Sequence, residues 1–271
     1  MSDLTAQQQD QLSLDAITAI TEDIKATQPL ISPLRDILDL KRQYENHQLF
    51  LSGIDDVATR HAKYRQIRGD GNCFYRAFLL TLCESLAKEG GGGGGGVVSL
   101  SANGELARVA ALLAGALKDC GTAGYDSSTL EMFHAELVSV LGFLASPPSG
   151  CSPAGLLAML GEEGGPSEYA TWFLRALTAC QLKKDRERFA MYLPDNYFGD
   201  LDGFVEKEVL PMGREVEQVQ IIALVEYFGV RVSIEYLDGH SEKVSCHELG
   251  SDESVTILKL LYRPGHYDAL Y

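Results

Sequence analysis

Long hydrophobic runs are absent from this chain of 271 residues, and no stretch approaches the roughly 18–20 apolar residues of a membrane-spanning helix. The first ten residues are polar and rich in glutamine, without the basic start and apolar core of a signal peptide. Basic residues are also scarce, since 23 Lys and Arg stand against 38 Asp and Glu and the net charge is −15. An acidic chain gains no counterion-release energy from nucleic acid and is repelled by anionic lipid. We therefore expect neither nucleic acid nor a membrane among its partners.

Cysteine is sparse and scattered rather than arranged in a dense framework. In a chain of this size without an export signal, six cysteines indicate free thiols in the reducing cytoplasm or nucleus. Hydrophobic residues make up 45% and charged residues 23%, which is the balance of a globular protein. That balance excludes a wholly disordered chain, a collagen and a coiled-coil rod. The six positions are Cys73, Cys83, Cys120, Cys151, Cys180 and Cys246.

The first 60 residues are interpreted as a disordered tail, residues 1–12, and a helical arm, residues 13–60. Ser13 is a suitable N-cap for a helix that Pro29 would end. So short a helix is unstable alone in water, and therefore either the rest of the chain or a bound partner must cover its apolar stripe. The stripe consists of Ile17, Ile20 and Ile24, and two further short helices are expected from Ser32-Pro33 onward and near residues 55–64.

Residues 61–271 are predicted to form one α+β domain in which many helices flank a small sheet. Apolar residues recur at helical spacing in six segments, while alternating or continuous apolar runs mark three strands near the C-terminus. The run 255–262 is apolar on both faces apart from Lys259, which favours a central strand. The helical segments are 72–88, 104–118, 127–145, 154–160, 167–182 and 216–228, and the strands are 230–236, 255–262 and 266–271.

Seven consecutive glycines occupy Gly90–Gly96. A phosphate-binding loop would need a strand before the glycines and Gly-Lys-Ser/Thr after them, but Val97-Val98-Ser99 follows instead. We interpret this run as a flexible low-complexity insertion in the domain.

One segment combines a tight glycine loop with a cysteine at a helix start. Gly69, Asp70 and Gly71 form the turn. Asn72 is a suitable N-cap, and Cys73 follows it at the start of an apolar helix, where the helix dipole favours a thiolate. The N–H groups from Asp70 through Cys73 are placed to bind a developing oxyanion. The residues alone leave a second interpretation open, in which Cys73 is a small buried hydrophobe.

A second segment pairs a histidine with a carboxylate. If residues 266–271 form a strand, His266 and Asp268 point to the same face with Cβ atoms roughly 6.5–7 Å apart. The carboxylate would then accept Nδ1–H of the imidazole and leave Nε2 free to take a proton from a thiol. Taken alone, His266 also fits a surface or capped core histidine. A cysteine far upstream and an oriented histidine far downstream is the usual chain order of cysteine hydrolases.

These two segments resemble known motifs. The run Asp70-Gly71-Asn72-Cys73-Phe74-Tyr75-Arg76-Ala77 resembles the nucleophile motif of the ovarian-tumour (OTU) family of cysteine-dependent deubiquitinases. The run Tyr262-Arg263-Pro264-Gly265-His266-Tyr267-Asp268 resembles the histidine motif of that family. Within the family the chain is most similar to the otubains, over roughly residues 15–271. Further similar segments are Met132-Phe133-His134, Tyr169–Tyr192, Val209-Leu210-Pro211-Met212, Gln220–Leu224 and Ile234-Glu235-Tyr236.

The resemblance implies a papain-like α+β core and a reaction. The reaction is hydrolysis of the isopeptide bond at the C-terminus of ubiquitin through an acyl-enzyme thioester. Cys73 would be the nucleophile and His266 the general base and then acid. Asp268 would orient His266, and Asp70 would belong to the loop that shapes the oxyanion hole.

Ubiquitin and polyubiquitin chains are the partners that the resemblance implies, with no metal or organic cofactor and a monomeric enzyme. A groove that excludes side chains would select the Gly-Gly end of ubiquitin, and Gly265 and Tyr267 are its expected walls. Otubains often favour lysine-48-linked chains, and their helical region contacts the distal ubiquitin. Some use the N-terminal region to bind ubiquitin or ubiquitin-conjugating enzymes. The alternative function is therefore a mainly non-catalytic inhibitor of ubiquitin-conjugating enzymes.

Overall fold

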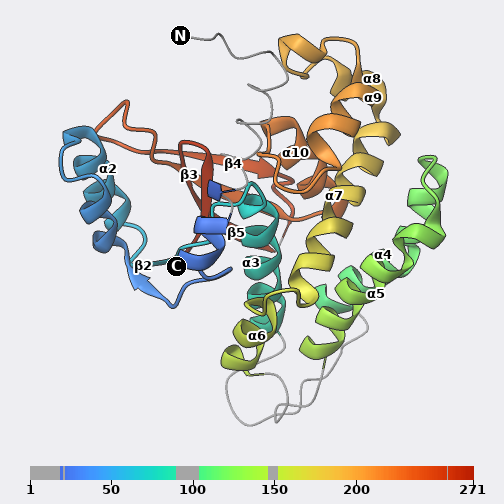
Figure 1. The fold of residues 1–271 in the computed structure, drawn as a ribbon, viewed down its shortest axis with the longest axis horizontal. Coiled ribbons are helices and arrows are strands. Elements are labelled where there is room, and N and C mark those ends of the chain that lie inside the picture. The colour runs from blue at the N-terminus through green and yellow to red at the C-terminus, as the bar shows by residue number, and fades with distance from the viewer. Residues whose placement is uncertain (1–18, 21, 90–103, 146–151, 255) are drawn as a thin grey trace, which may run out of the picture.

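The computed structural model describes residues 19–20, 22–89, 104–145, 152–254 and 256–271 (Figure 1). The predicted tail over residues 1–12 and the Gly90–Gly96 insertion lie outside the described residues. The fold is α+β, as predicted, with a six-stranded sheet in the order β1-β2-β6-β5-β3-β4. None of the described helices combines the length and apolarity needed to cross a membrane.

The sheet is built mainly from the C-terminal end of the chain. β3 and β5 pair in parallel, and the other neighbouring strands pair antiparallel. β5 lies between β6 and β3, which confirms the prediction of a central strand. The strands are β1 (Arg35–Asp36), β2 (Lys63–Arg65), β3 (Arg231–Tyr236), β4 (Ser245–Gly250), β5 (Ile257–Arg263) and β6 (His266–Leu270).

All six helices predicted within residues 61–271 are present, and local signals fix their ends. Ser152 caps α6 by accepting the N–H of Gly155, and Gly229 ends α10 with a φ of +60°, which favours glycine. The six are α3 (Cys73–Glu89), α4 (Glu105–Thr122), α5 (Ser127–Leu144), α6 (Pro153–Leu160), α7 (Pro166–Lys184) and α10 (Gln218–Phe228). Shorter elements that were not predicted lie between α7 and α10: α8 (Arg186–Ala190), η2 (Asp195–Tyr197), α9 (Leu201–Phe204) and the π-helical turn η3 (Val205–Val209).

Residues 30–58, which were predicted to belong to a helical arm, pack as part of the domain. The helix expected from Ser32-Pro33 begins later, as the 3₁₀ helix η1 (Ile37–Gln43), because Asp36 caps it by accepting the N–H of Leu38. The helix expected near residues 55–64 lies earlier, as α2 (Gln48–Ala58). It ends before β2 because β2 pairs with β1 and with β6.

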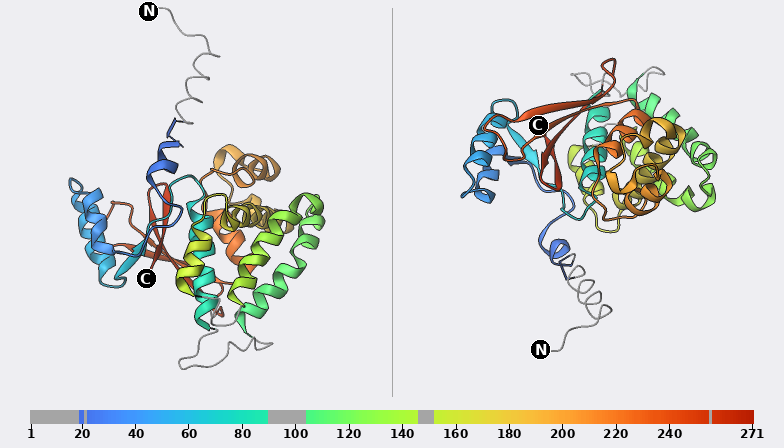
Figure 2. Two further views of the ribbon diagram at one scale, coloured as in Figure 1. Left: turned by 60° about the horizontal axis from the view of Figure 1, so that its bottom comes forward. Right: turned by 90° about the horizontal axis from the view of Figure 1, so that it is seen from above.

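The sheet separates two apolar cores. On one face Leu258 and Leu260 of β5 join the large core beneath α3, α7 and α10. On the other face Leu261 joins a smaller core with Ile37 of η1 and Ile54 of α2. This alternation follows the two-residue side-chain period of a strand. Figure 2 shows the sheet between α2 and the larger helical layer.

The N-terminal helix joins the domain through Lys25 and Gln28, whose carbonyl oxygens accept bonds from Arg68. Residues 22–27 are helical, and the helix stops two residues before Pro29, as the sequence predicts. Ile20 is 60% exposed, so the domain leaves this part of the predicted apolar stripe uncovered.

Candidate active site

The candidate nucleophile Cys73 lies at the first residue of α3, and only 4% of it is exposed. The preceding loop contains Gly71, whose φ of +75° favours glycine. A Cβ atom at Gly71 would lie 2.2 Å from the carbonyl oxygen of Gly213. The loop of residues 69–72, called the cysteine loop below, therefore packs closely against the 210–217 segment. This contact helps to fix where α3 begins.

The sequence-predicted histidine and carboxylate lie at the same site. β6 packs along α3, and the thiol of Cys73 lies close enough to His266 to raise the pKa of the imidazole. Nε2 of His266 lies 2.8 Å from Oδ1 of Asp268. The structure thus brings together the three residues that the two motifs singled out.

The prediction was wrong about which imidazole nitrogen serves which partner. Nε2 faces Asp268, and this leaves Nδ1 for the thiol of Cys73. The reason is reach, because two-residue spacing on a strand separates the Cβ atoms by roughly 6.5–7 Å. Nε2 is the ring nitrogen farther from Cβ, so it is the atom that spans this gap.

Asp268 is fully buried, and both of its oxygens are occupied. Oδ1 accepts the backbone N–H of Ile67 at 2.9 Å as well as the imidazole of His266. Oδ2 accepts two bonds from Arg263, at 3.0 Å from Nε and 2.7 Å from Nη2. Burial opposes ionisation, but the hydrogen bond to His266 and the charge of Arg263 hold the pKa of Asp268 below its ordinary value. The carboxylate is therefore ionised and fixed in orientation.

His266 holds its proton more strongly than an ordinary histidine. Burial lowers the pKa of the imidazole, but the hydrogen bonds to Asp268 and Cys73 outweigh this effect and raise the pKa to about 9. The imidazolium is thus favoured at neutral pH, beside a cysteine at a helix N-terminus. A cation in this position is what stabilises a thiolate nucleophile.

Asp70 braces the cysteine loop. Its carboxylate accepts the N–H of Asn72 at 3.0 Å and two bonds from Arg76, at 3.0 and 2.9 Å. Burial opposes ionisation of Asp70, but the bonds from Arg76 hold its pKa below the ordinary value. The prediction that every N–H from Asp70 through Cys73 faces an oxyanion is wrong for Asn72. Helix-start N–H groups have no intrahelical acceptor, so those of Gly71 and Cys73 are the candidates for the oxyanion hole.

Arg175 of α7 is the residue of this site that sequence reasoning missed. It is fully buried, and its Nη2 donates to the carbonyl oxygens of Gly71 at 3.0 Å and Arg214 at 2.7 Å. Nη2 also donates to Oδ1 of Asn72 at 2.9 Å. That oxygen accepts the N–H of Gly213 as well, so Asn72 joins two loops rather than capping α3. A lone arginine in an apolar helical run was the available signal, because a buried charge needs polar partners.

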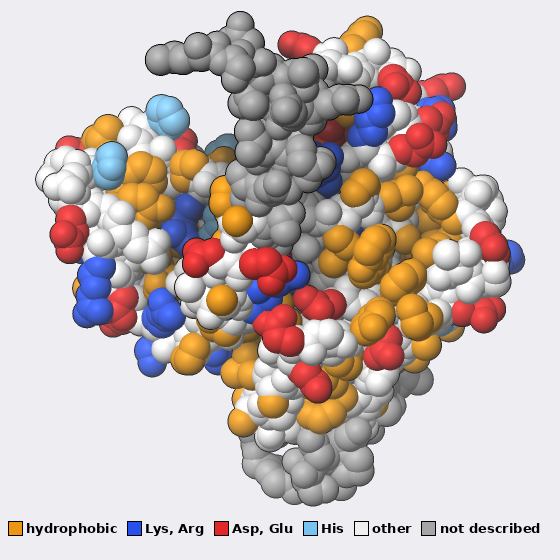
Figure 3. Space-filling model, viewed as in Figure 1, with side chains coloured by type: hydrophobic (Ala, Val, Ile, Leu, Met, Phe, Trp, Pro, Cys, Tyr) orange, Lys and Arg blue, Asp and Glu red, His pale blue; other side chains and the backbone are white. Residues whose placement is uncertain are grey.

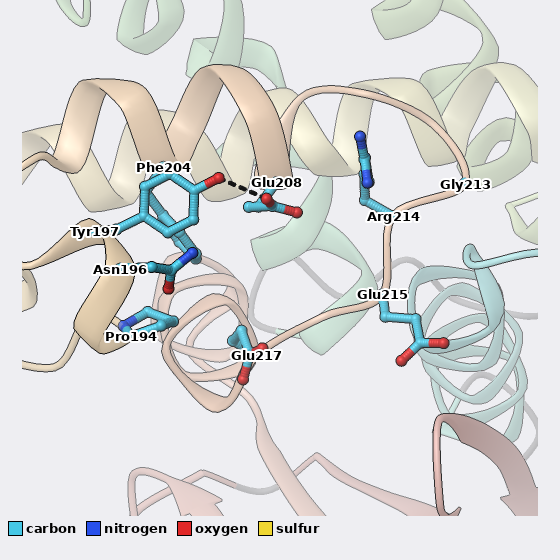
Figure 4. Close-up of a pocket in the computed structure, with 9 residues that line it drawn as sticks. All are labelled: Pro194, Asn196, Tyr197, Phe204, Glu208, Gly213, Arg214, Glu215 and Glu217. Carbon is cyan, nitrogen blue, oxygen red and sulfur yellow. Dashed lines mark hydrogen bonds between the residues drawn. The ribbon is translucent and has the colours of Figure 1, made fainter. Parts of the chain in front are cut away.

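A cavity of about 410 Å³ opens beside the segment that contacts the cysteine loop. Figure 4 shows its lining, in which the hydroxyl of Tyr197 donates to Glu208 at 2.6 Å. Glu215 extends from this lining toward Gly265, where an added Cβ would lie 3.3 Å from Oε1 of Glu215. Gly265, one of the two expected walls of the groove, therefore has little free space on the side of Glu215. Tyr267 is only 6% exposed, so it supports the site mainly from within the core.

No metal centre accompanies this site in the part of the chain that the structure describes. Among residues 19–20, 22–89, 104–145, 152–254 and 256–271, no group of three or more His, Cys, Asp or Glu is arranged to hold a metal ion.

An α+β fold with a cysteine at a helix N-terminus, an imidazole against it and a carboxylate behind the imidazole defines the class of cysteine peptidases. Within that class the chain belongs to the otubains, peptidase family C65, whose family model matches residues 23–271. This confirms the family that the two sequence motifs indicated.

Relatives of known name match over most of the chain. Human ubiquitin thioesterase OTUB1 is 29% identical over 253 residues, which cover 93% of this chain and 86% of that protein. The otubain-like ubiquitin thioesterase of Caenorhabditis elegans is 28% identical over 256 residues, covering 92% of this chain and 84% of that protein. A solved complex of h/ceOTUB1 with ubiquitin aldehyde and UBC13~Ub matches with a TM-score of 0.82 and 26% identity, covering 97% of this chain and 98% of that chain.

Proposed function

We propose that this chain is a deubiquitinase that hydrolyses the isopeptide bond at the C-terminus of ubiquitin, with Cys73 as its nucleophile. The observation that carries the proposal is the placement of His266 beside Cys73 at the start of α3, with Asp268 hydrogen-bonded behind the imidazole. The names of the relatives, which are ubiquitin thioesterases, support the substrate class.

In the reactive state Nδ1 of His266 already holds the proton given up by the thiol of Cys73. Sγ attacks the carbonyl carbon of the terminal glycine of ubiquitin, and the carbonyl oxygen becomes an oxyanion that accepts N–H groups at the start of α3. The C–N bond then breaks, and the leaving lysine amine takes the proton from His266. Ubiquitin remains attached to Cys73 as a thioester.

Deacylation repeats these roles with water. His266 removes a proton from water, the resulting hydroxide adds to the thioester carbonyl, and the C–S bond breaks. Cys73 leaves as a thiolate and ubiquitin departs as a carboxylate. Asp268 stays ionised throughout and stabilises the imidazolium that forms in each half of the reaction.

An apolar surface over α5 and α7 supports ubiquitin as the partner. Met132 and Trp172 are exposed by 56% and 41%, and Phe133 stacks on Tyr169 and Trp172 at centroid distances of 6.2 and 5.6 Å. Figure 3 shows hydrophobic side chains gathered over these helices. Large exposed apolar patches mark interaction surfaces. We assign this surface to the distal ubiquitin.

The direct test is reaction with a ubiquitin that carries an electrophilic C-terminus. We expect one ubiquitin on Cys73, mapped by mass spectrometry, and no reaction in Cys73→Ala. The matched control is Cys83→Ala, which changes another buried cysteine of α3 and should react like the wild type. Modification of Cys83, or continued modification of the Cys73→Ala variant, would contradict the assignment.

We further propose that the enzyme prefers ubiquitin chains linked through lysine 48. On a panel of di-ubiquitins we expect the lysine-48-linked dimer to be cleaved fastest. Equal rates on every linkage would remove this preference and leave the hydrolase activity intact. We further propose that the enzyme acts in the cytoplasm, and also in the nucleus, which the scattered cysteines support.

Inhibition of ubiquitin-conjugating enzymes is a second candidate function. It is supported by solved OTUB1 complexes with ubiquitin aldehyde and the conjugates UBC13~Ub and UBCH5B~Ub. The two functions separate in a Cys73→Ser variant, which should lose hydrolysis. If the variant still blocks ubiquitin transfer from a charged conjugating enzyme, the chain also acts as an inhibitor. Unimpeded transfer would exclude this second function.

A further inference from the structure

Two cysteines that the proposed reaction does not use lie side by side on different helices. Cys120 is on α4 and Cys180 is on α7, and their Sγ atoms are 3.2 Å apart. Both are buried, at 0% and 3% exposure. Sixty residues separate them in the chain, so helix packing alone places the two thiols together.

We propose that Cys120 and Cys180 form an oxidation site, at which a peroxide converts the two thiols into a disulfide that joins α4 to α7. A disulfide has an S–S distance of about 2.05 Å, so the sulfur atoms need to approach by only about 1 Å. Rotation of the two side chains supplies movement of this size without unfolding either helix. The proposal is independent of ubiquitin hydrolysis.

The hydrogen bond between the two thiols makes them chemically different. Cys180 donates its S–H to the sulfur of Cys120. This bond holds the pKa of Cys120 below its ordinary value against the effect of burial, while the bond and burial together raise the pKa of Cys180. Thiolates rather than thiols react with peroxides, so Cys120 is the sulfur that we expect to be oxidised first.

A cavity reaches Cys180, and the Sγ atom of Cys120 lies 3.2 Å behind it. A cavity of about 280 Å³ is lined by Cys180 together with Asp119, Ala123, Lys183 and Tyr227. A water molecule occupies about 30 Å³ of liquid, so a cavity of this size admits a peroxide.

The chemistry proceeds in two steps. The thiolate of Cys120 attacks one oxygen of hydrogen peroxide, the O–O bond breaks, and hydroxide leaves and takes up a proton to form water. The sulfur becomes a sulfenic acid. Cys180, which loses its proton, then attacks that sulfur, the S–O bond breaks, and a second water leaves. Overall two thiols are oxidised and one peroxide is reduced to two waters.

The cross-link would act on the helix that holds the active site. Arg175 precedes Cys180 by little more than one turn of α7, and its side chain donates to the cysteine loop at Gly71. A disulfide would fasten α4 to this helix and close a long loop of chain. Closing a long loop restricts the unfolded chain and so stabilises the fold.

The test uses the full chain with Cys73→Ser, which removes the candidate nucleophile as a competing thiol. After hydrogen peroxide treatment we expect a non-reducing digest to contain a peptide that joins Cys120 to Cys180, lighter by two hydrogen atoms than the sum of the two reduced peptides. The melting temperature should rise by a few degrees and return after a thiol reductant. Oxidation of Cys246, which is exposed, shows that the oxidant was sufficient.

Matched variants separate this site from general oxidation. Cys120→Ala and Cys180→Ala should each abolish the linked peptide and the rise in melting temperature, whereas Cys83→Ala should retain both. Alanine leaves no unpaired buried hydroxyl, and reduced samples of each variant report whether it folds. Three results would overturn the proposal: both thiols intact while Cys246 is oxidised, a disulfide between other cysteines, or sulfinic acid at Cys120 without a cross-link.

Discussion

Substitution of Arg175 tests whether a buried guanidinium holds the cysteine loop in its working position. Its two terminal nitrogens donate to four neutral oxygens, of Gly71, Asn72, Val209 and Arg214, at 2.7–3.0 Å. Arg175→Met keeps an unbranched apolar stem and removes all four hydrogen bonds. Arg175→Lys keeps the charge, but a single ammonium group cannot reproduce the planar fork.

The expected magnitude follows from the acceptors left without donors. A buried acceptor that loses its donor costs about 1–3 kcal/mol. Asn72 Oδ1 keeps the N–H of Gly213, so the remaining three acceptors at the low end cost about 3 kcal/mol. Water entry recovers part of this, and the cost of burying the guanidinium disappears. We expect Arg175→Met to lower the free energy of unfolding by about 2–4 kcal/mol and Arg175→Lys by about 1–2 kcal/mol. Relaxation of the loop should lower kcat about 10–100-fold, equivalent to about 1.4–2.7 kcal/mol of barrier.

The assay combines urea unfolding with turnover of a fluorogenic ubiquitin substrate, measured where every variant is folded. We expect kcat to fall while KM stays close to the wild-type value, because the substitution leaves the exposed surfaces intact. The matched control is Arg186→Lys, an exposed arginine paired with Asp202, which should change stability by less than about 1 kcal/mol. Wild-type stability and kcat in Arg175→Met would refute the reasoning. A raised KM with unchanged kcat would also refute it, because the side chain would then act on binding.

Three further substitutions probe the rest of the site, and one deletion probes the N-terminal segment. The pKa of His266 rises from 6.5 to about 9 on folding. Protonation of His266 therefore stabilises the folded state fully below pH 6.5, and this stabilisation is lost as the pH rises through 9. The urea midpoint of the wild type should exceed that of His266→Ala at low pH, and the difference should shrink over this range. Asp268→Asn should lower the pKa of His266 and move the basic limb of kcat/KM to lower pH; an unmoved limb would exclude His266 as its source. Gly71→Ala should lower the free energy of unfolding by at least about 2 kcal/mol, because φ is positive at this position and the added Cβ would meet the carbonyl oxygen of Gly213. Gly115→Ala on α4 is the control. Nothing lies within 4 Å of its added Cβ, so thermal melts should show unchanged or raised stability. Deletion of residues 1–20 should raise KM for di-ubiquitin with little change in melting temperature, and a uniform loss on all substrates would assign those residues a structural role.

The chemical residues of the site were predictable because their signals are local. Cys73 follows a glycine turn and opens an apolar helix, and two-residue spacing puts His266 and Asp268 on one face of a strand. The helices of residues 61–271 were predictable for the same reason, since each is long enough to repeat its apolar period several times.

The N-terminal elements were misplaced because distant pairing determines them. Lys63–Arg65 has too few residues to show an alternating pattern, and it is a strand because Tyr64 pairs with Leu270 at the other end of the chain. That pairing ends α2 at Ala58. No pattern within residues 55–64 reports it, so periodicity alone continued the helix through the strand.

The contacts that hold the site residues in position were not predicted, because they form between segments that are distant in the sequence. Spacing along a strand gave the correct partners for His266, but the reach of the ring decides which nitrogen each partner meets. Arg263 was part of the histidine motif, yet its two bonds to Asp268 form only when the turn between β5 and β6 closes. Arg175 lies about 100 residues from the loop it holds.

Buried arginines, rather than apolar contacts, hold the polar segments of this site. Arg76 binds the carboxylate of Asp70, and Arg263 binds the carboxylate behind the imidazole. Arg175 joins the 70–72 turn to the 209–214 segment. Loop carbonyls and carboxylates cannot be satisfied by apolar packing. A guanidinium stays protonated and presents five donors in one plane, so a single side chain can fix several oxygens.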